Sequence, residues 1–405
     1  MIILRVFTKF YYKNPVSRNR KTIFATMKLL VLCAVALGIV SGAHYSDLAV
    51  KGALGNPGQL LSLYQEFADN EGKVKSSQRL TLFKSSLKRI SEGNARHPTW
   101  TQGLNKFADM TPQEKKSYLG LNITSLHKKR LFQVADRSGI PASKDWRAEG
   151  KVTGVKDQGD CGSCWSFGAV GPIETNYAIL TGKLKSFAEK EYLDCVYKSN
   201  GCNGGFYESS WKYSKKRGRL ALTRDAPYVA RDGRCGRTYK NMHDGLISQK
   251  ITGYYTVPPG EDKVISWLAK GAVGIAFEVT DDFMLYQKGI VEDKSCKCGN
   301  TGCGKWGSAN HAVTAVGYTP KSMILKNSWG TAWGMKGFWE TARGTDLCEY
   351  FRWGALPEWE PTGKKDNDPE YVPTEDEDCE GTNADGCACG TVRCGDGVCR
   401  HAHMC

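Results

Sequence analysis

Apolar residues recur at three- and four-residue spacing in the N-terminal third of the chain, which is the period of one helix face. The segment around them, about 44–137, is rich in helix formers, so the pattern predicts a helical N-terminal domain. The residues that define this face are Leu80, Phe83, Leu87 and Ile90.

Two further patterns divide the middle and the C-terminal half of the chain. An apolar stretch over 165–180 starts directly after Cys164, which predicts a long helix ending near Gly182. Farther on, short runs rich in β-branched and aromatic residues predict strands. These runs are residues 312–318, 323–325 and 337–340.

A shorter apolar run near the N-terminus indicates targeting. A basic residue precedes about 11 apolar residues, and 40–43 are small, as at a signal-peptide cleavage site. The run is short of the roughly 20 residues that span a bilayer. We therefore predict a leader over 1–43, with the signal peptide starting at Met27. Residues 1–26 are either a long basic leader or lie upstream of the start that is used.

The chain has 405 residues and a formal net charge of +14, enough length for two or three domains. Residues 1–43 contain seven Lys/Arg and no acids, whereas 361–405 contain four Lys/Arg and ten acids. The central region is only mildly basic and has no zinc-finger spacing, so no nucleic-acid partner is expected.

Cysteine usage fits an oxidising compartment. Of the 16 cysteines, Cys33 lies in the predicted signal peptide. If Cys164 is a free thiol, 14 cysteines remain, an even number that could form seven disulfides.

Residues 361–378 are acidic and contain three prolines, which predicts a linker. Six cysteines follow within 379–405, so this tail is predicted to be a disulfide module.

The most informative motif surrounds Cys164. It reads Cys-Gly-Ser-Cys-Trp over 161–165, with Gln158 shortly before it, His311 147 residues after Cys164, and Asn327 farther on. A cysteine nucleophile needs a base, a group that orients the base, and donors for the oxyanion, and this set supplies all three.

The motif and the distant His and Asn resemble the papain family of cysteine proteases, over about residues 60–357. The resemblance implies an α+β, papain-like two-domain fold, with a helical domain facing a β-barrel domain across a catalytic cleft. The implied domains are an inhibitory helical propeptide over 44–139 and a peptidase domain over 140–360.

The propeptide resembles that of cathepsin L-like relatives. Residues 103–109 read Gly-Leu-Asn-Lys-Phe-Ala-Asp, an intact family motif, and the family's helical motif is partly present. Two of its positions differ, with Lys75 in place of Glu and Ser86 in place of Asn. The matching positions are Arg79, Phe83, Ile90 and Asn94.

The resemblance also implies the catalytic roles. Cys164 is expected to be the nucleophile, His311 the acid and base, and Asn327 the residue that orients the imidazole, with Trp329 covering that contact. Gln158 and the backbone N–H of Cys164 are expected to form the oxyanion hole. Cofactors and metals are not expected.

Substrate contacts follow by position. Gly204 and Gly205 are expected to pair with the substrate backbone, and Asn310 and Trp329 are also expected to contact the substrate. Phe206 and Tyr207 are expected to wall the pocket for the residue two before the cut, with Trp353 at its floor. An aromatic-lined, shallow pocket predicts a preference for modest apolar side chains and poor acceptance of basic ones.

Family positions imply the bridges Cys161–Cys202 and Cys195–Cys235. Cys348 is expected to pair with one of three preceding cysteines, Cys296, Cys298 or Cys303, and we take Cys303 as the candidate. These three cysteines could instead bind a metal, but no histidine stands in a suitable register.

The sequence thus predicts a cysteine endopeptidase made as an inactive preproenzyme in the secretory pathway, lysosomal or extracellular. Its partners would be peptide substrates and its own propeptide. A non-catalytic binding protein on a protease scaffold is the alternative. The tail is either a disulfide module that binds an unknown partner or a removable disulfide knot that aids secretion.

Asn122 begins the sole glycosylation sequon in the sequence, Asn-Ile-Thr, and is the expected glycosylation site.

Overall fold

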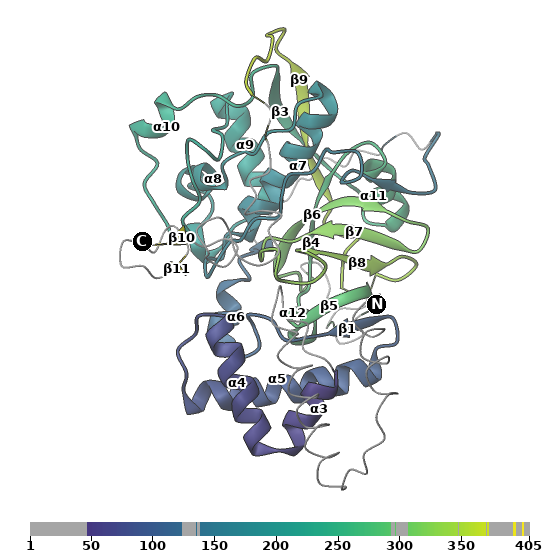
Figure 1. Cartoon of the computed structure of the whole chain (residues 1–405). Helices are drawn as coiled ribbons and strands as arrows, with labels where there is room; N and C mark the ends of the chain where they lie inside the picture. Colours follow the sequence, from purple (N-terminus) through teal and green to yellow (C-terminus); the bar gives the residue numbers. More distant parts are fainter. Residues whose placement is uncertain are drawn as a thin grey trace, which may run out of the picture. The chain divides into compact units, whose positions relative to one another are not determined.

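The computed structural model describes residues 47–123, 135, 138–292, 296, 307–346, 348–369 and 371, together with the strand pairs 392–393 and 399–400 (Figure 1). The predicted signal peptide, Cys298, Cys303 and most of the Cys-rich tail lie outside the described residues. No helix within the described ranges is long and apolar enough to cross a membrane.

The N-terminal helices fold around the face that the sequence predicts. Phe83 is fully buried, and its ring packs 5.4 Å from that of Tyr64 and 4.9 Å from that of Phe67. Ser76 caps the helix that carries Phe83 by accepting from the Arg79 N–H. The helices are α3 (Asp47–Gly55), α4 (Pro57–Asn70), α5 (Ser77–Arg96) and α6 (Pro112–Ser117).

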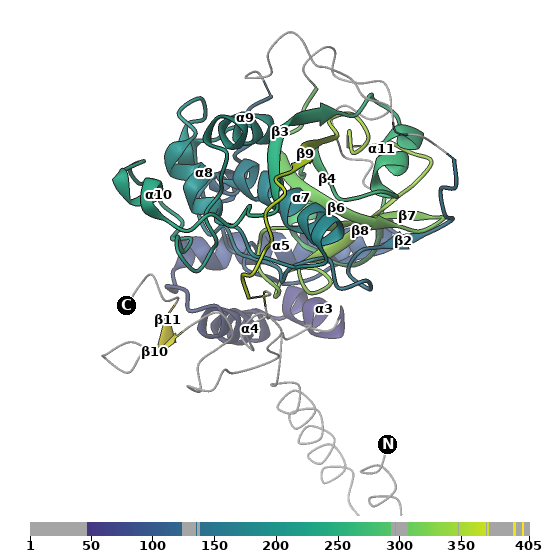
Figure 2. The ribbon, with the colours of Figure 1, turned by 90° about the horizontal axis from the view of Figure 1, so that it is seen from above.

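The predicted central helix is α7 (Cys164–Thr181), and it ends at Gly182, which takes a left-handed φ of 76°. Figure 2 shows α8, α9 and α10 on one side of α7. On the other side are strands β6 (His311–Tyr318), β7 (Ser322–Lys326) and β8 (Phe338–Ala342). Because α7 is buried from Cys164 to Ala178, it lies at the junction of the two halves. Its helical neighbours are α8 (Glu189–Cys195), η2 (Gly201–Asn203), α9 (Tyr207–Arg217) and α10 (Arg237–Asn241).

The described part of the chain forms a nine-stranded sheet in the order β1-β5-β8-β7-β6-β4-β9-β3, with β2 paired to β6. The pairing is antiparallel except between β5 and β8. Its strands are β1 (Trp100–Gln102), β2 (Lys144–Asp145), β3 (Gln249–Thr256), β4 (Val273–Phe277), β5 (Tyr286–Val291), β6 (His311–Tyr318), β7 (Ser322–Lys326), β8 (Phe338–Ala342) and β9 (Ala355–Pro361).

Strand β1 belongs to the predicted propeptide and pairs with β5 at the edge of this sheet. Helices α11 (Glu261–Leu268) and α12 (Asp281–Met284) complete the peptidase region, and β10 (Val392–Arg393) pairs with β11 (Cys399–Arg400) in the tail. The propeptide is therefore hydrogen-bonded to the peptidase region through its backbone.

Helix α7 approaches β6 closely at two glycines. A Cβ at Gly168 would lie 3.1 Å from the Ala312 Cβ, and one at Gly171 would lie 2.1 Å from the Thr314 Oγ1. Any side chain at Gly171 would push the helix away from the strand. This close packing sets the distance between the helix that starts at Cys164 and the strand that starts at His311.

The structure contains the bridges Cys161–Cys202 and Cys195–Cys235. The choice of Cys303 as the partner of Cys348 is wrong, because Cys348 is bonded to Cys296. Both cysteines lie beside Glu278, whose N–H donates to the Cys348 carbonyl at 3.0 Å and whose carbonyl lies 3.9 Å from the Cys296 Sγ. The backbone around Glu278 therefore brings these two cysteines together.

Replacing Phe83 by Ala is expected to lower the free energy of unfolding of the proenzyme's helical domain by about 3–5 kcal/mol, because a buried aromatic ring leaves a cavity. Urea unfolding of the full chain measures the loss. Leu61→Ala in α4 is the control, since Leu61 is 46% exposed and its truncation should change stability by less than about 0.5 kcal/mol. Equal losses for both variants would contradict the packing described.

Candidate active site

Cys164 is the first residue of α7 and is fully buried. The loop before it is fixed by the Cys161–Cys202 bridge and by the Gly162 N–H, which donates to the Cys202 carbonyl at 2.9 Å. The Trp165 indole donates to the Gly201 carbonyl at 3.1 Å. The sulfur therefore stands at the positive end of a long helix, which favours a thiolate.

His311 and Asn327 meet as the sequence predicts. His311 opens β6, Asn327 follows β7, and the Nε2 of the histidine lies 2.9 Å from the Asn327 Oδ1. The Ser328 N–H also donates to this oxygen at 2.9 Å. The rings of Trp329 and His311 are 4.7 Å apart, so the indole covers the contact. This arrangement fixes the orientation of the imidazole.

Gln158 is fully buried, and its amide is held in one orientation. The Ser328 hydroxyl donates to the Oε1 at 2.7 Å, and the Nε2 donates to the carbonyls of Cys161 at 2.9 Å and Tyr118 at 3.1 Å. Tyr118 is a propeptide residue. The donor expected to bind an oxyanion is thus occupied by a propeptide carbonyl. Sequence reasoning missed the orienting role of Ser328, although it flanks Asn327.

The propeptide reaches the nucleophile itself. The Gly120 N–H donates to the Cys164 Sγ at 3.3 Å, and the Gly120 carbonyl accepts from the Gly205 N–H at 2.9 Å. A Cβ on Gly120 would lie 1.7 Å from the Gly162 carbonyl oxygen, so no side chain fits there. Sequence reasoning did not single out this glycine, since only the folded chain brings it to residue 162.

The next propeptide residues continue along the predicted substrate-binding positions. The Leu121 N–H donates to the Asn310 carbonyl at 3.2 Å, and the Asn122 N–H donates to the Gly205 carbonyl at 2.8 Å. Leu121 and Gly205 form a parallel bridge. The propeptide backbone therefore occupies the positions where the sequence predicts a substrate.

Burial under this cover changes the protonation of the catalytic pair. Burial raises the pKa of the Cys164 thiol to about 11, although the backbone N–H groups of Ala312, Gly120 and Trp165 act against the rise. Burial also lowers the pKa of His311 to about 4, outweighing its hydrogen bond to Asn327. Both groups are neutral near pH 7 in the covered site.

The predicted pocket residues lie in one buried cluster. Phe206, Tyr207 and Trp353 belong to the same apolar cluster as Cys164, and this cluster includes the propeptide residue Ile123. The Tyr207 hydroxyl donates to the Trp353 carbonyl. Trp353 is 5% exposed. Gly204 has a φ of 114° and begins the loop that leads into these aromatic residues.

The comparisons with known proteins agree with this geometry. Residues 140–352 match the model of the papain family cysteine proteases, and residues 66–114 match the cathepsin propeptide inhibitor domain (I29). The chain therefore belongs to the papain family and is a cysteine endopeptidase made as a zymogen.

Individual relatives cover most of the chain. A cathepsin L-like proteinase of Fasciola hepatica is 34% identical over 323 residues, which is 76% of this chain and 95% of the relative. Papain of Carica papaya is 34% identical over 333 residues, which is 78% of this chain and 92% of papain.

The fold has solved counterparts in proenzyme form. The digestive procathepsin L2 of the Tenebrio molitor larval midgut superposes with a TM-score of 0.66 and 29% identity, over 74% of this chain and 99% of that one. This likeness confirms the predicted α+β papain-like fold with its propeptide.

Gly120→Ala is expected to lift the propeptide from the cleft, because the added Cβ would overlap the Gly162 carbonyl group. We expect labelling of Cys164 in the uncleaved proenzyme to become at least about tenfold faster, which corresponds to about 1.4 kcal/mol. Gly55→Ala is the control, since a Cβ there meets nothing within 4 Å. Equal labelling rates in the two variants would show that Gly120 is not tightly enclosed.

Proposed function

We propose that Cys164, His311, Asn327 and Gln158 carry out peptide hydrolysis once the propeptide has left. The Cys164 thiolate attacks the substrate carbonyl and forms a tetrahedral oxyanion, bound by the Gln158 amide and the Cys164 backbone N–H. His311 then protonates the leaving amine, which gives a thioester. It later takes a proton from water, which releases the acid product and restores the thiol.

The observation that carries this proposal is the position of the propeptide backbone. The Tyr118 carbonyl accepts from Gln158 while the Gly120 N–H reaches the Cys164 sulfur, so a peptide already lies between the donor and the nucleophile. A substrate carbonyl in the same place would be within reach of both groups. The 2.9 Å contact between His311 and Asn327 supports the role of the histidine.

The propeptide would inhibit the enzyme in two ways. It blocks access to Cys164, and it keeps the thiol protonated. A thiol whose pKa is raised to about 11 stays protonated at pH 7. Loss of the propeptide would return water and a polar surface to the cleft. The thiolate and imidazolium would then stabilise one another, as the helix end at Cys164 favours.

The proposed maturation separates residues 44–139 from the peptidase domain, which begins near residue 140. The new N-terminus is held, since the Tyr318 hydroxyl donates to the Pro141 carbonyl at 2.8 Å. Asn122 is exposed at the cleft and is the proposed glycosylation site. Its glycan would leave with the propeptide. The proposed route is the secretory pathway, to a lysosome or the outside of the cell.

Labelling with an epoxide thiol probe tests the catalytic proposal. We expect intact mass to show one label on the acid-activated wild type, and none on the uncleaved proenzyme, because its thiol is buried and protonated. The Cys164→Ala variant, activated in trans, is the control and should take no label. An activated wild type that takes no label would overturn the assigned nucleophile and favour a non-catalytic scaffold.

The proposed pocket predicts selectivity for the residue two before the cut. Wild type should prefer Val or Leu and accept Arg poorly in a peptide library, since Trp353 fills the floor without offering a charge. Trp353→Ala should raise kcat/KM for Phe relative to Val by about tenfold or more, because it removes bulk from the pocket.

The ratio of two substrates on the same enzyme does not depend on how much of the variant folds. Trp359→Ala is the control, since Trp359 lies on β9 and its ring is 6.2 Å from that of Tyr177. The pocket assignment fails if wild type favours Arg, or if both variants change the ratio equally.

A further inference from the structure

The first part of the predicted acidic linker lies against the peptidase domain. Residues 362–369 and 371, which we call the strap, follow the end of β9. The Thr362 N–H donates to the Ser248 carbonyl at 3.0 Å, and its hydroxyl donates to the Ile247 carbonyl at 2.6 Å. At the other end, the Tyr371 N–H donates to the Leu184 carbonyl at 2.8 Å. The strap is therefore anchored at both ends.

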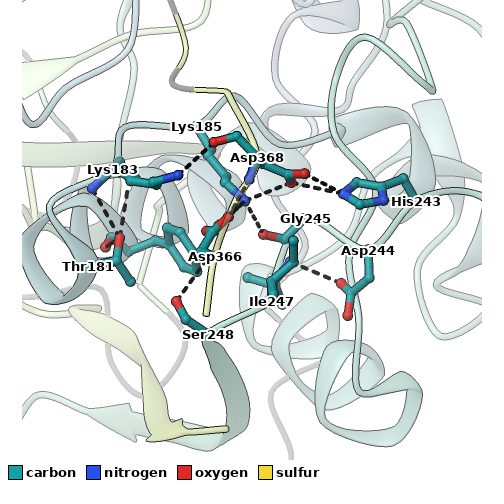
Figure 3. Close-up of polar contacts among 12 residues, drawn as sticks. Thr181, Lys183, Lys185, His243, Asp244, Gly245, Ile247, Ser248, Asp366 and Asp368 are labelled. Atoms are coloured by element: carbon teal, nitrogen blue, oxygen red, sulfur yellow. Dashed lines mark hydrogen bonds and ion pairs between the residues drawn. The ribbon is translucent and has the colours of Figure 1, made fainter. Parts of the chain in front are cut away.

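A buried lysine holds the centre of the strap (Figure 3). The Lys185 side chain is 1% exposed, and its Nζ donates to the carboxylates of Asp366 at 2.9 Å and Asp368 at 2.8 Å and to the Gly245 carbonyl at 3.1 Å. These three acceptors match the three N–H donors of an ammonium group. A buried charge needs such partners, because leaving it unpaired is strongly unfavourable.

Neighbouring groups complete this site. The Tyr177 hydroxyl donates to Asp366, and the His243 Nε2 lies 2.8 Å from the Asp368 carboxylate. The Lys183 Nζ donates to the Asp368 carbonyl at 2.7 Å. The Asp368 N–H donates to the Asp366 Oδ1 at 3.0 Å, which fixes the spacing of the two carboxylates. The site thus binds an acidic Asp-x-Asp segment.

We propose that this surface of Tyr177, Lys183, Lys185 and His243 is a docking site for the acidic strap, and that it keeps the C-terminal extension attached to the mature enzyme. All of the strap's anchors described above lie in the peptidase domain, between residues 177 and 248. Removing the propeptide therefore takes none of them away. The match to the papain family ends at residue 352, before the strap begins.

The contacts of Asp366 and Asp368 are expected to persist at the acidic pH used to activate the proenzyme. Partial burial acts to raise the pKa values of Asp366 and Asp368, but Lys185 outweighs it, with Tyr177 at Asp366 and His243 at Asp368. Both pKa values lie below the ordinary range. The contribution of these carboxylates to stability is present above the usual Asp pKa of about 4 and is lost only as pH falls through the lowered values.

Three further charged groups lie on or beside the strap, at Asp244, Lys364 and Lys365. The Asp244 carboxylate, next to His243, accepts from the N–H groups of Leu220 at 3.2 Å and Leu246 at 3.0 Å. Lys364 and Lys365, on the strap itself, are exposed. These two lysines provide a matched control for the charged residues that dock.

Hydrogen exchange on the full chain at pH 4.5 tests the proposal, in a Cys164→Ala background that cannot cut itself. We expect the peptide covering residues 362–371 to exchange at least about tenfold faster in Asp366→Asn/Asp368→Asn than in the parent. Lys364→Gln/Lys365→Gln should leave the exchange unchanged. Unchanged exchange in the double Asn variant, or a strap that already exchanges freely in the parent, would overturn the proposal.

A further variant separates docking from folding, because the Asn substitutions leave Lys185 without a counter-charge. Adding Lys185→Met removes that charge, so stability should recover while the strap still exchanges fast. In parallel, intact mass of the acid-activated wild type should include residues beyond 371. Loss of the extension during activation would also overturn the proposal. The exchange measurement does not depend on protease activity, so its outcome is independent of the catalytic assignment.

Discussion

The close contact between α7 and β6 is the constraint on which the active site depends. Gly168 and Gly171 let the helix lie against the strand, and a side chain at Gly171 would meet Thr314. Cys164 and His311 stand at the first positions of these two elements. Because α7 is buried from Cys164 to Ala178, close packing resists a shift that would change this distance. Two residues that are 147 positions apart in the sequence thus owe their geometry to the absence of two side chains.

The propeptide meets the sulfur and the oxyanion donor with backbone groups. Tyr118 supplies a carbonyl to Gln158, and Gly120 supplies an N–H to the sulfur. Such contacts imitate a peptide without placing a scissile bond in the reactive orientation, and the bridge between Leu121 and Gly205 is parallel. Covering the site also removes the water that would solvate the thiolate and the imidazolium. Cys164 and His311 therefore both stay neutral and inactive.

Local patterns were sufficient to predict the elements that carry the catalytic residues. The helix from Cys164 to Thr181 and the strand at His311 are both encoded by contiguous residues, and the motif around Cys164 indicated the family. Three features depended on distant partners and could not be predicted. Sequence spacing does not show which cysteine bonds to Cys348, and Gly120 belongs to no sequence motif. The acidic, proline-containing segment has the composition of a linker. Only the folded chain shows that it binds Lys185, 181 residues before Asp366.

Strand β1 has a consequence for the enzyme after maturation. While the propeptide is present, Trp100 and its neighbours cover the edge of β5, and Trp100 is 2% exposed. In the proposed maturation, departure of β1 would leave β5 as an outer strand with unpaired backbone groups, which is the kind of surface that recruits other chains. Lys288 adds a charge to this edge of β5. Gly289, whose φ is 99°, breaks the regular strand backbone beside it. The mature protease would thus carry its own protection against self-association at the place where its inhibitor was once attached.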